Sequence, residues 1–187
     1  MRPRLQYAAD TVIEMVTLTP LPMTESSIAD CGEFLGPKQR NPDFAELASR
    51  GWAVDFNVSG RTQLMFLQTD YLGARFTELE RHLNVSQAFI HTGGPAAVVA
   101  VAPPSVTPPK PDQVRALRIE PGMGYVLKVG AWHSLDRHPV ALPGSTFVMV
   151  SCEETTQDLM VAPVGQRRLT ITVDYQAKFA VAFDFLI

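Results

Sequence analysis

Prolines and glycines interrupt this chain so often that they leave little room for long helices. Its 187 residues include 15 prolines and 12 glycines, spread over the whole length. Proline breaks the interior of a helix and glycine weakens it. The chain must therefore fold into an architecture of short elements.

Several segments between these breaks alternate polar and apolar residues with period two, which is typical of strands. We expect strands at 62–67, 75–82, 97–102, 114–119, 146–150 and 169–175. Short strands separated by turn residues indicate a β-sandwich or barrel. One short helix is expected at 42–50, which Pro42 opens and Gly51 follows. The proline-rich stretch 102–111 is expected to be an extended surface loop.

Length and composition predict one globular domain over residues 1–187, with 46% hydrophobic and 19% charged residues. The net charge of -3 comes without a basic cluster, which argues against nucleic acid as a partner. The absence of a long apolar run argues against a membrane span or a secretory signal. Cys31 and Cys152 lie far apart in the sequence, so we expect free thiols and a cytoplasmic protein.

The segment from Glu80 to Gln87 is the first that indicates a functional site. Glu80 and His82 are two residues apart, so on a strand their side chains project from the same face. After a turn at 83–86, Gln87 can return on the next strand and face the same interior. A carboxylate and an imidazole side by side are suited to proton transfer.

The second such segment runs from Gly122 to His133. Glycines at 122, 124 and 130 predict tight turns, and Trp132 provides a large apolar anchor beside His133.

Both segments resemble the motifs of the cupin family in order and spacing. The first cupin motif has paired histidines, a glutamate five positions later, and a closing glycine. The second has a glycine, a proline, a second glycine and a histidine. The corresponding residues here are Glu80, His82, Gln87 and Gly94, then Gly122, Lys128, Gly130 and His133. The resemblance implies a cupin-type β-barrel, or jelly roll, with one or two short helices.

Within that class the chain is most similar to the ureidoglycolate lyases. The shared segments are Leu79-Glu80-Arg81-His82, Gln87-Ala88-Phe89-Ile90, Pro121-Gly122-Met123-Gly124, Trp132-His133 and the opening Leu18-Thr19-Pro20. The resemblance covers about 16–158 and leaves 159–187 as a C-terminal strand extension. It implies a homodimeric enzyme of purine catabolism and allantoin degradation. Such an enzyme splits ureidoglycolate into glyoxylate and urea.

Some positions depart from the pattern of those enzymes. Lys128 replaces a histidine, Val126 an asparagine and Ser134 a second histidine. An arginine before the first motif corresponds to Phe66, and an Asp-Arg pair to Ser151-Cys152. A changed substrate is therefore an alternative: another small carboxylate or sugar acid, with or without a metal. A non-catalytic cupin that binds a small ligand is the third alternative.

We expect His82 or Glu80 to act as the base and His133 as the acid. Lys128 is expected to hold the substrate carboxylate and Gln87 to donate to the ureido carbonyl, with Trp132 and Tyr125 also lining the substrate site. Cupins often hold a divalent ion, and nickel or manganese could bind Glu80, His82 and His133. A metal-free site is favoured, because the ammonium group of Lys128 would repel a cation and glutamine is a weak ligand.

Other notable side chains are expected to be structural. Arg81 points to the face opposite Glu80 and His82, and His91 and His138 are expected at the surface. The apolar tail 179–187 needs cover, which favours a homodimer.

Overall fold

A computed structural model describes residues 12–187. The described chain is mainly β, with 46% of its residues in strands and 12% in helices. The fold is consistent with the cupin type, and its low helical share confirms the sequence prediction. None of the described helices has the length and hydropathy that crossing a membrane requires.

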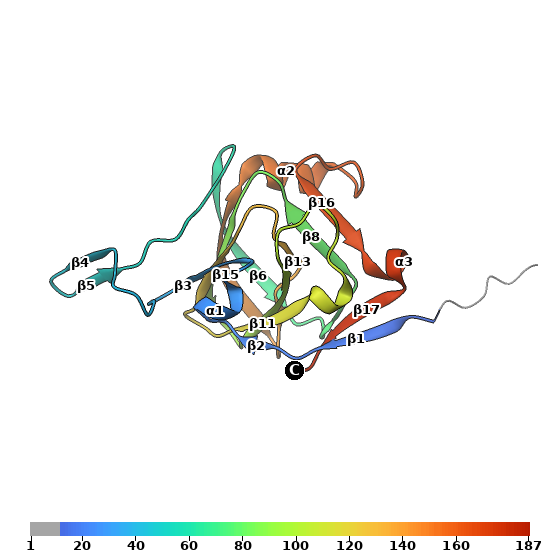
Figure 1. Cartoon of the computed structure of the whole chain (residues 1–187), viewed down its shortest axis with the longest axis horizontal. Coiled ribbons are helices and arrows are strands. Elements are labelled where there is room, and N and C mark those ends of the chain that lie inside the picture. The colour runs from blue at the N-terminus through green and yellow to red at the C-terminus, as the bar shows by residue number, and fades with distance from the viewer. Residues whose placement is uncertain (1–11) are drawn as a thin grey trace, which may run out of the picture.

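Three sheets form the body of the molecule (Figure 1). The five-stranded sheet has the order β3 (Gly32–Leu35), β12 (Gly124–Leu127), β9 (Gln87–Gly93), β15 (Gly144–Cys152) and β6 (Thr62–Asp70). The seven-stranded sheet has the order β16 (Thr170–Asp174), β8 (Glu78–His82), β13 (Trp132–Ser134), β10 (Ala97–Ala102), β11 (Arg115–Ile119) and β2 (Leu21–Pro22), and β14 (His138–Pro139) also pairs with β10. The three-stranded sheet has the order β1 (Glu14–Leu18), β17 (Val181–Phe185) and β7 (Arg75–Phe76).

The remaining elements are short. A hairpin of β4 (Phe44–Glu46) and β5 (Ser49–Gly51) forms a separate two-stranded sheet. The helices are α1 (Glu25–Ile28), α2 (Glu153–Val161) and α3 (Tyr175–Phe179), with one 3-10 helix, η1 (Pro111–Gln113).

The central strand β10 is buried on both faces, which explains its unbroken apolar sequence. Val99 and Val101 contribute to a core between the two larger sheets, together with Phe89 and Tyr125. The alternate side chains of β10 pack in a second core that includes Trp132 and the outer three-stranded sheet. The site described below lies on the inner face, between the larger sheets.

The expected strands are confirmed except for the segment 75–82. That segment is divided at Thr77 into β7 and β8, which belong to different sheets. Period-two alternation identifies extended chain but does not show where the chain passes from one sheet to another. The proline-rich loop is also confirmed, since regular structure is absent between Ala102 and Pro111.

The helix expected at 42–50 is wrong, because this segment forms the β4–β5 hairpin. Its turn includes Leu47, whose φ of 50° is incompatible with a helix. Phe44 is 53% exposed and Leu47 fully exposed, so a helix here would have no apolar face packed on the body. The hairpin instead satisfies backbone groups across its two strands, as in the bond from Asp43 N to Gly51 O (2.9 Å).

The C-terminal segment is covered by its own chain. β17 pairs in parallel with β1 and antiparallel with β7, and Phe183 is completely buried in the second core. The apolar residues of β17 are thus covered within the chain, so their need for cover does not favour a homodimer. Cys31 and Cys152 are free thiols, as expected, and both are buried.

Candidate functional site

Three buried side chains from two neighbouring strands meet on the inner face of the seven-stranded sheet. Glu80 and His82 project from β8 and His133 from β13, where His133 is paired with Glu80. The distance from His82 Nε2 to a carboxylate oxygen of Glu80 is 3.6 Å, and the two imidazole centroids lie 5.2 Å apart. The structure thus brings together the Glu80, His82 and His133 of the sequence analysis.

Hydrogen bonds orient both imidazoles through their Nδ1 atoms. His82 Nδ1 lies 2.9 Å from Thr170 Oγ1, and His133 Nδ1 lies 2.9 Å from the carbonyl oxygen of Ser134. Because a carbonyl only accepts, His133 carries its proton on Nδ1 and a lone pair on Nε2. Neither Nε2 atom has a hydrogen-bond partner among the described residues.

Glycines fix the local backbone at this site. Gly130 has a φ of +80°, and its amide donates to the carbonyl of His82 (2.8 Å), which seats β13 beside β8. A Cβ atom at Gly94 would lie 2.3 Å from the carbonyl oxygen of Gly144. The tight turn expected at Gly122 is confirmed by its φ of +85°, whereas Gly124 instead begins β12.

Gln87 projects from β9 toward the same interior, as expected. Its amide nitrogen donates to Ser151 Oγ (3.3 Å), while its Oε1 has no partner among the described residues. It therefore offers a free carbonyl oxygen, and its amide nitrogen is held by β15.

Arg137 is the site residue that sequence reasoning missed. Its guanidinium lies 3.7 Å above the ring of Phe89 and donates to Tyr125 Oη (3.1 Å) and to the Leu135 carbonyl (2.8 Å). The side chain is only 6% exposed, and its Nη2 has no partner among residues 12–187. A guanidinium held in this way is prepared to bind an anion.

Burial and charge shift the pKa values of the three central groups in opposite directions. Burial raises the pKa of Glu80 to about 7, although Arg137 and Arg167 act against this rise. Burial, with the charge of Arg137, lowers the pKa of His82 to about 4. The same two causes place the pKa of His133 well below its ordinary value. Near neutral pH both imidazoles are therefore uncharged and Glu80 is partly protonated.

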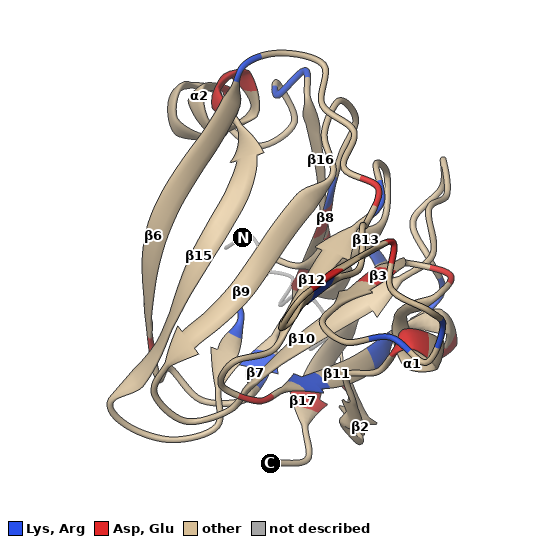
Figure 2. Cartoon of the chain, turned by 90° about the vertical axis from the view of Figure 1, so that its left-hand side faces the viewer, with Lys and Arg blue, Asp and Glu red and all other residues tan. Residues whose placement is uncertain are grey.

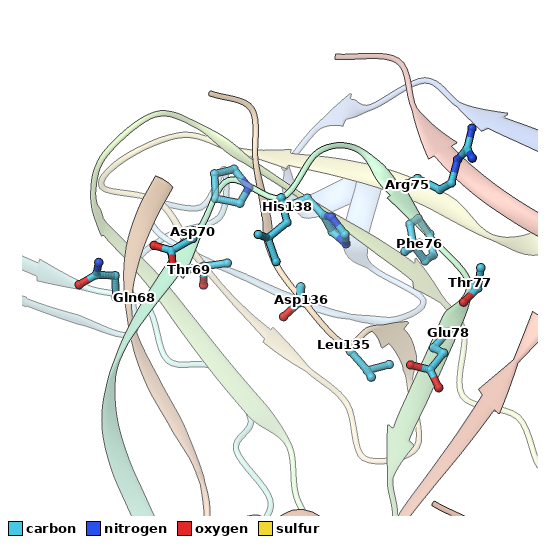
Figure 3. Close-up of a pocket in the computed structure, with 12 residues that line it drawn as sticks. Gln68, Thr69, Asp70, Arg75, Phe76, Thr77, Glu78, Leu135, Asp136 and His138 are labelled. Atoms are coloured by element: carbon cyan, nitrogen blue, oxygen red, sulfur yellow. The ribbon is translucent and has the colours of Figure 1, made fainter. Parts of the chain in front are cut away.

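Two adjoining cavities give access to this region. An inner cavity of about 300 Å³ is lined by Glu80, Gln87 and Arg137, with apolar walls from β6 and β15. A larger outer cavity of about 410 Å³ lies around the end of β6 and the start of β8 (Figure 3). Both are lined by Leu135 and Asp136, so the loop after β13 lies between them. His82 and His133 line a narrow recess that Gln87 also lines.

Three expected substrate-binding residues have other surroundings. Lys128 is exposed, and its ammonium group donates to the carbonyl of Ala29 (2.8 Å). The side chain lies at the rim of the recess and does not line the inner cavity. Trp132 projects from β13 on the face opposite His133 and lies in the second core. Tyr125 is buried beneath Arg137, and its role is to support that side chain.

Most positions that depart from the family pattern do not face the inner cavity. Phe66 stands at the position of the family's arginine and was expected to be a changed pocket residue, but this is wrong, because it is 68% exposed on the outer side of β6. Val126 borders a polar groove beside Glu33, outside the inner cavity. Ser134 Oγ accepts from the Ala100 amide and donates to the Asp136 carbonyl, which shapes the loop before Arg137.

Two histidines expected at the surface are buried. His91 lies within β9, where its Nε2 is 2.9 Å from the Pro95 carbonyl oxygen. His138 packs against Phe76 and Phe185 on the outer side of the seven-stranded sheet. Arg81 does point away from Glu80 and His82, as expected, and lies over the ring of Trp132.

The three central residues fit a metal ion. Glu80, His82 and His133 each offer one ligand atom, and these atoms lie within 4.8 Å of one another. The unpartnered Nε2 atoms suit a divalent transition metal, and the Nδ1 bond of His133 to a carbonyl is the usual support of a metal ligand. Lys128, expected to repel a cation here, donates elsewhere, although Arg137 remains close.

Comparison with protein families gives one match. A family model described as "Ureidoglycolate lyase" matches residues 15–171, which is most of the chain. A search of curated proteins finds no significant match.

Proposed function

Because the chain belongs to the ureidoglycolate lyase family, we propose that it cleaves ureidoglycolate into glyoxylate and urea at the site of Glu80, His82 and His133. Such a carbon–nitrogen lyase would serve purine catabolism, in the degradation of allantoin. The observation that carries the proposal is the Arg137 guanidinium, which has no ion-pair partner among residues 12–187 and lines a cavity together with Glu80.

Arg137 supports a carboxylate substrate because its charge is buried without a neutralising partner. No carboxylate of the described chain lies within ion-pair distance of its guanidinium. A buried charge is costly unless it is paired. The carboxylate of ureidoglycolate would supply that pair through Nη2, in the role first expected of Lys128.

The reaction requires one proton to leave the substrate hydroxyl and another to reach the departing urea nitrogen. As the hydroxyl proton leaves, its oxygen becomes the carbonyl of glyoxylate, and the carbon–nitrogen bond electrons pass to the nitrogen. Neutral His133, with a lone pair on Nε2, is suited to accept the hydroxyl proton. His82 is an alternative acceptor.

Glu80 is better suited than His133 to act as the acid. His133 has no proton on Nε2, whereas Glu80 retains one near neutral pH because burial raises its pKa to about 7. The acid role expected of His133 is therefore assigned to Glu80. Gln87 Oε1, which is unpartnered, would accept a bond from the ureido nitrogen instead of donating to the ureido carbonyl.

A second candidate retains the same reaction and uses Glu80, His82 and His133 as metal ligands. The two unpartnered Nε2 atoms favour it. A bound ion such as nickel or manganese would supply a Lewis acid, while Arg137 would still hold the carboxylate. If catalysis is metal-free, elemental analysis should find less than one divalent ion per purified chain. The activity should also survive treatment with a chelator. One tightly held ion that is lost in His133→Ala would favour the second candidate.

The same barrel could serve two other functions. It could act as an enzyme on another small carboxylate or sugar acid, or it could bind a small ligand without catalysis. The discriminating assay incubates purified protein with ureidoglycolate and quantifies urea and glyoxylate together. We expect equimolar release that falls by about 10²–10⁴-fold in His133→Ala. The matched control is Arg118→Met, because this partly exposed arginine of β11 binds Glu120 and lines neither the inner cavity nor the recess. A wild-type protein that releases no urea above background would contradict the proposal.

A further inference from the structure

The inner cavity has an apolar side next to its polar groups. A row of three side chains crosses neighbouring strands there: Phe89 on β9, Met149 on β15 and Met65 on β6. The register pairs Phe89 with Met149 and Met149 with Met65, so all three project from the same face. Figure 2 shows these strands side by side, with α2 at one end of β6 and β15. Because neighbouring strands lie about 4.7–4.9 Å apart, the row extends about 10 Å from Phe89, above which Arg137 lies.

Two leucines extend this apolar side. Leu67 follows Met65 on the same face of β6, and Leu159 lines the cavity from α2. Thr156 also lines it from α2, but its hydroxyl already donates to Gln63 (2.6 Å). The apolar side chains beyond Phe89, here named the apolar wall, are Met65, Leu67, Met149 and Leu159.

Ureidoglycolate makes no use of the apolar wall. Under the proposed function its carboxylate, its hydroxyl carbon and its first nitrogen would lie at Arg137, Glu80 and Gln87. Beyond the ureido carbonyl it has only a terminal amino group, whose two N–H donors need acceptors. Methionine and leucine side chains would leave these donors unpaired, which is costly in a buried site. A hydrocarbon group beyond the carbonyl matches this wall better than an amino group does.

We propose that the site also cleaves, and prefers, N-acyl-α-hydroxyglycines in which the acyl group is apolar. These compounds retain the carboxylate, the hydroxyl and the first nitrogen, and they carry a hydrocarbon chain in place of the terminal amino group. The hydroxyl proton leaves and its oxygen becomes the carbonyl of glyoxylate. The carbon–nitrogen bond breaks, and the nitrogen receives the bond electrons and a proton. The second product is then a primary amide in place of urea, and no oxidant, reductant or co-reactant takes part.

The size and shape of the inner cavity suit such a chain. Its volume of about 300 Å³ reaches the range of pockets that hold drug-sized ligands, about 300–1,000 Å³. Methionine side chains are flexible, so Met65 and Met149 can adapt to different hydrocarbon groups. Gln68 and Thr69 line both the inner and the outer cavity, so a longer acyl group has space toward the outer one. The inference rests on the proposed function, since it uses the same polar groups and the same bond cleavage.

Binding of uncleavable analogues tests the apolar wall separately from the chemistry. N-hexanoylglycine and N-carbamoylglycine both lack the hydroxyl, so neither can be cleaved by this route. In titration calorimetry with the full chain, the dissociation constant of N-hexanoylglycine should be lower by about tenfold or more, since each buried CH₂ favours binding.

Two variants and a control locate this preference. Met65→Gln and Leu159→Gln each place an amide in the apolar wall, so each should lower the ratio of the two dissociation constants by about threefold or more. Met160→Gln is the matched control, because Met160 is 80% exposed on α2 and does not line the inner cavity. Its ratio should equal that of the wild-type chain. Circular dichroism verifies that each variant is folded.

Glyoxylate release from ureidoglycolate and from N-hexanoyl-α-hydroxyglycine then separates this inference from the proposed function. We expect kcat/KM to be about tenfold or more higher for the acyl compound, with hexanamide as the second product. An acyl compound cleaved no better than ureidoglycolate, or equal binding of the two glycine derivatives, would overturn the inference and leave the proposed function intact. Cleavage of the acyl compound alone would support the inference and contradict ureidoglycolate as the substrate. Cleavage of neither compound would contradict both.

Discussion

At the scale of single residues, burial gives the site its acid–base properties. The same loss of water raises the pKa of Glu80 and lowers those of His82 and His133, because it disfavours the charged form of each group. A neutral base and a protonated acid can therefore coexist near neutral pH. In water near neutral pH, a glutamic acid would be ionised and an imidazole would be partly protonated.

This arrangement predicts the pH dependence of catalysis. Above about pH 7 Glu80 loses its proton, so kcat/KM should fall by up to about tenfold per pH unit. Toward pH 4 the rate should also fall, because His82, whose pKa is about 4, becomes a cation beside His133 and disfavours proton uptake by that base. Initial rates of urea release from about pH 4 to pH 9 measure both limbs. In Glu80→Gln the alkaline limb should disappear with most of the activity. A wild-type rate that rises steadily above pH 7 would rule out Glu80 as the acid.

Arg137 and Lys128 offer a second test, because either could hold the substrate carboxylate. Arg137→Met removes the charge that faces the inner cavity, so KM should rise by about 10- to 100-fold, as expected for a lost hydrogen bond to a charged group. Lys128→Met should change KM far less, because the ammonium group binds the Ala29 carbonyl. Steady-state kinetics compare the two variants, and the reverse order of effects would return the role to Lys128.

The sequence predicted the strand-borne residues of this site, Glu80 and His82 from strand geometry and His133 from the spacing of the cupin motifs. Glu80 and His82 are two apart on one strand, so their common face follows from the pleat. Arg137 lies in a loop, and its direction depends on Ser134, Tyr125 and Phe89, which no spacing rule connects. Its only signal was a single arginine shortly after the Trp132-His133 pair.

At the scale of elements, the two faces of the seven-stranded sheet have different roles. β8 and β13 each present polar site residues inward and apolar residues to the second core, which β17 and α3 help to cover. The strands were predictable because alternation is a local property. The β4–β5 hairpin was not predictable in this way, because the choice between helix and hairpin depends on packing, and β4 and β5 pair only with each other among the described strands.

The second core predicts a large difference between two phenylalanines near the C-terminus. Phe183 is fully buried and stacks on Phe76, so Phe183→Ala should cost about 3–5 kcal/mol of unfolding free energy. Phe179 is 40% exposed, and Phe179→Ala should cost much less. Urea unfolding followed by circular dichroism measures both. Equal losses would mean that β17 does not seal this core.

At the scale of the whole molecule, the last strand completes the packing around Trp132. A chain ending at residue 180 should therefore expose this core, with red-shifted tryptophan emission and binding of a hydrophobic dye. Removal of Leu186 and Ile187 alone is the control, because these residues are 64% and 48% exposed. A native-like spectrum for the shorter truncation product would show that the first core suffices for the fold.

The parallel pairing of β1 with β17 also affects how the protein is made. Glu14 lies beside Val181 and Leu18 beside Phe185, so β1 must wait for a strand that is synthesised much later. On the ribosome, β1 lacks this partner strand until residues 181–185 have been synthesised. Contacts so distant in sequence also slow folding. We therefore expect the nascent chain to stay incompletely folded for longer than a chain whose neighbouring strands pair with each other.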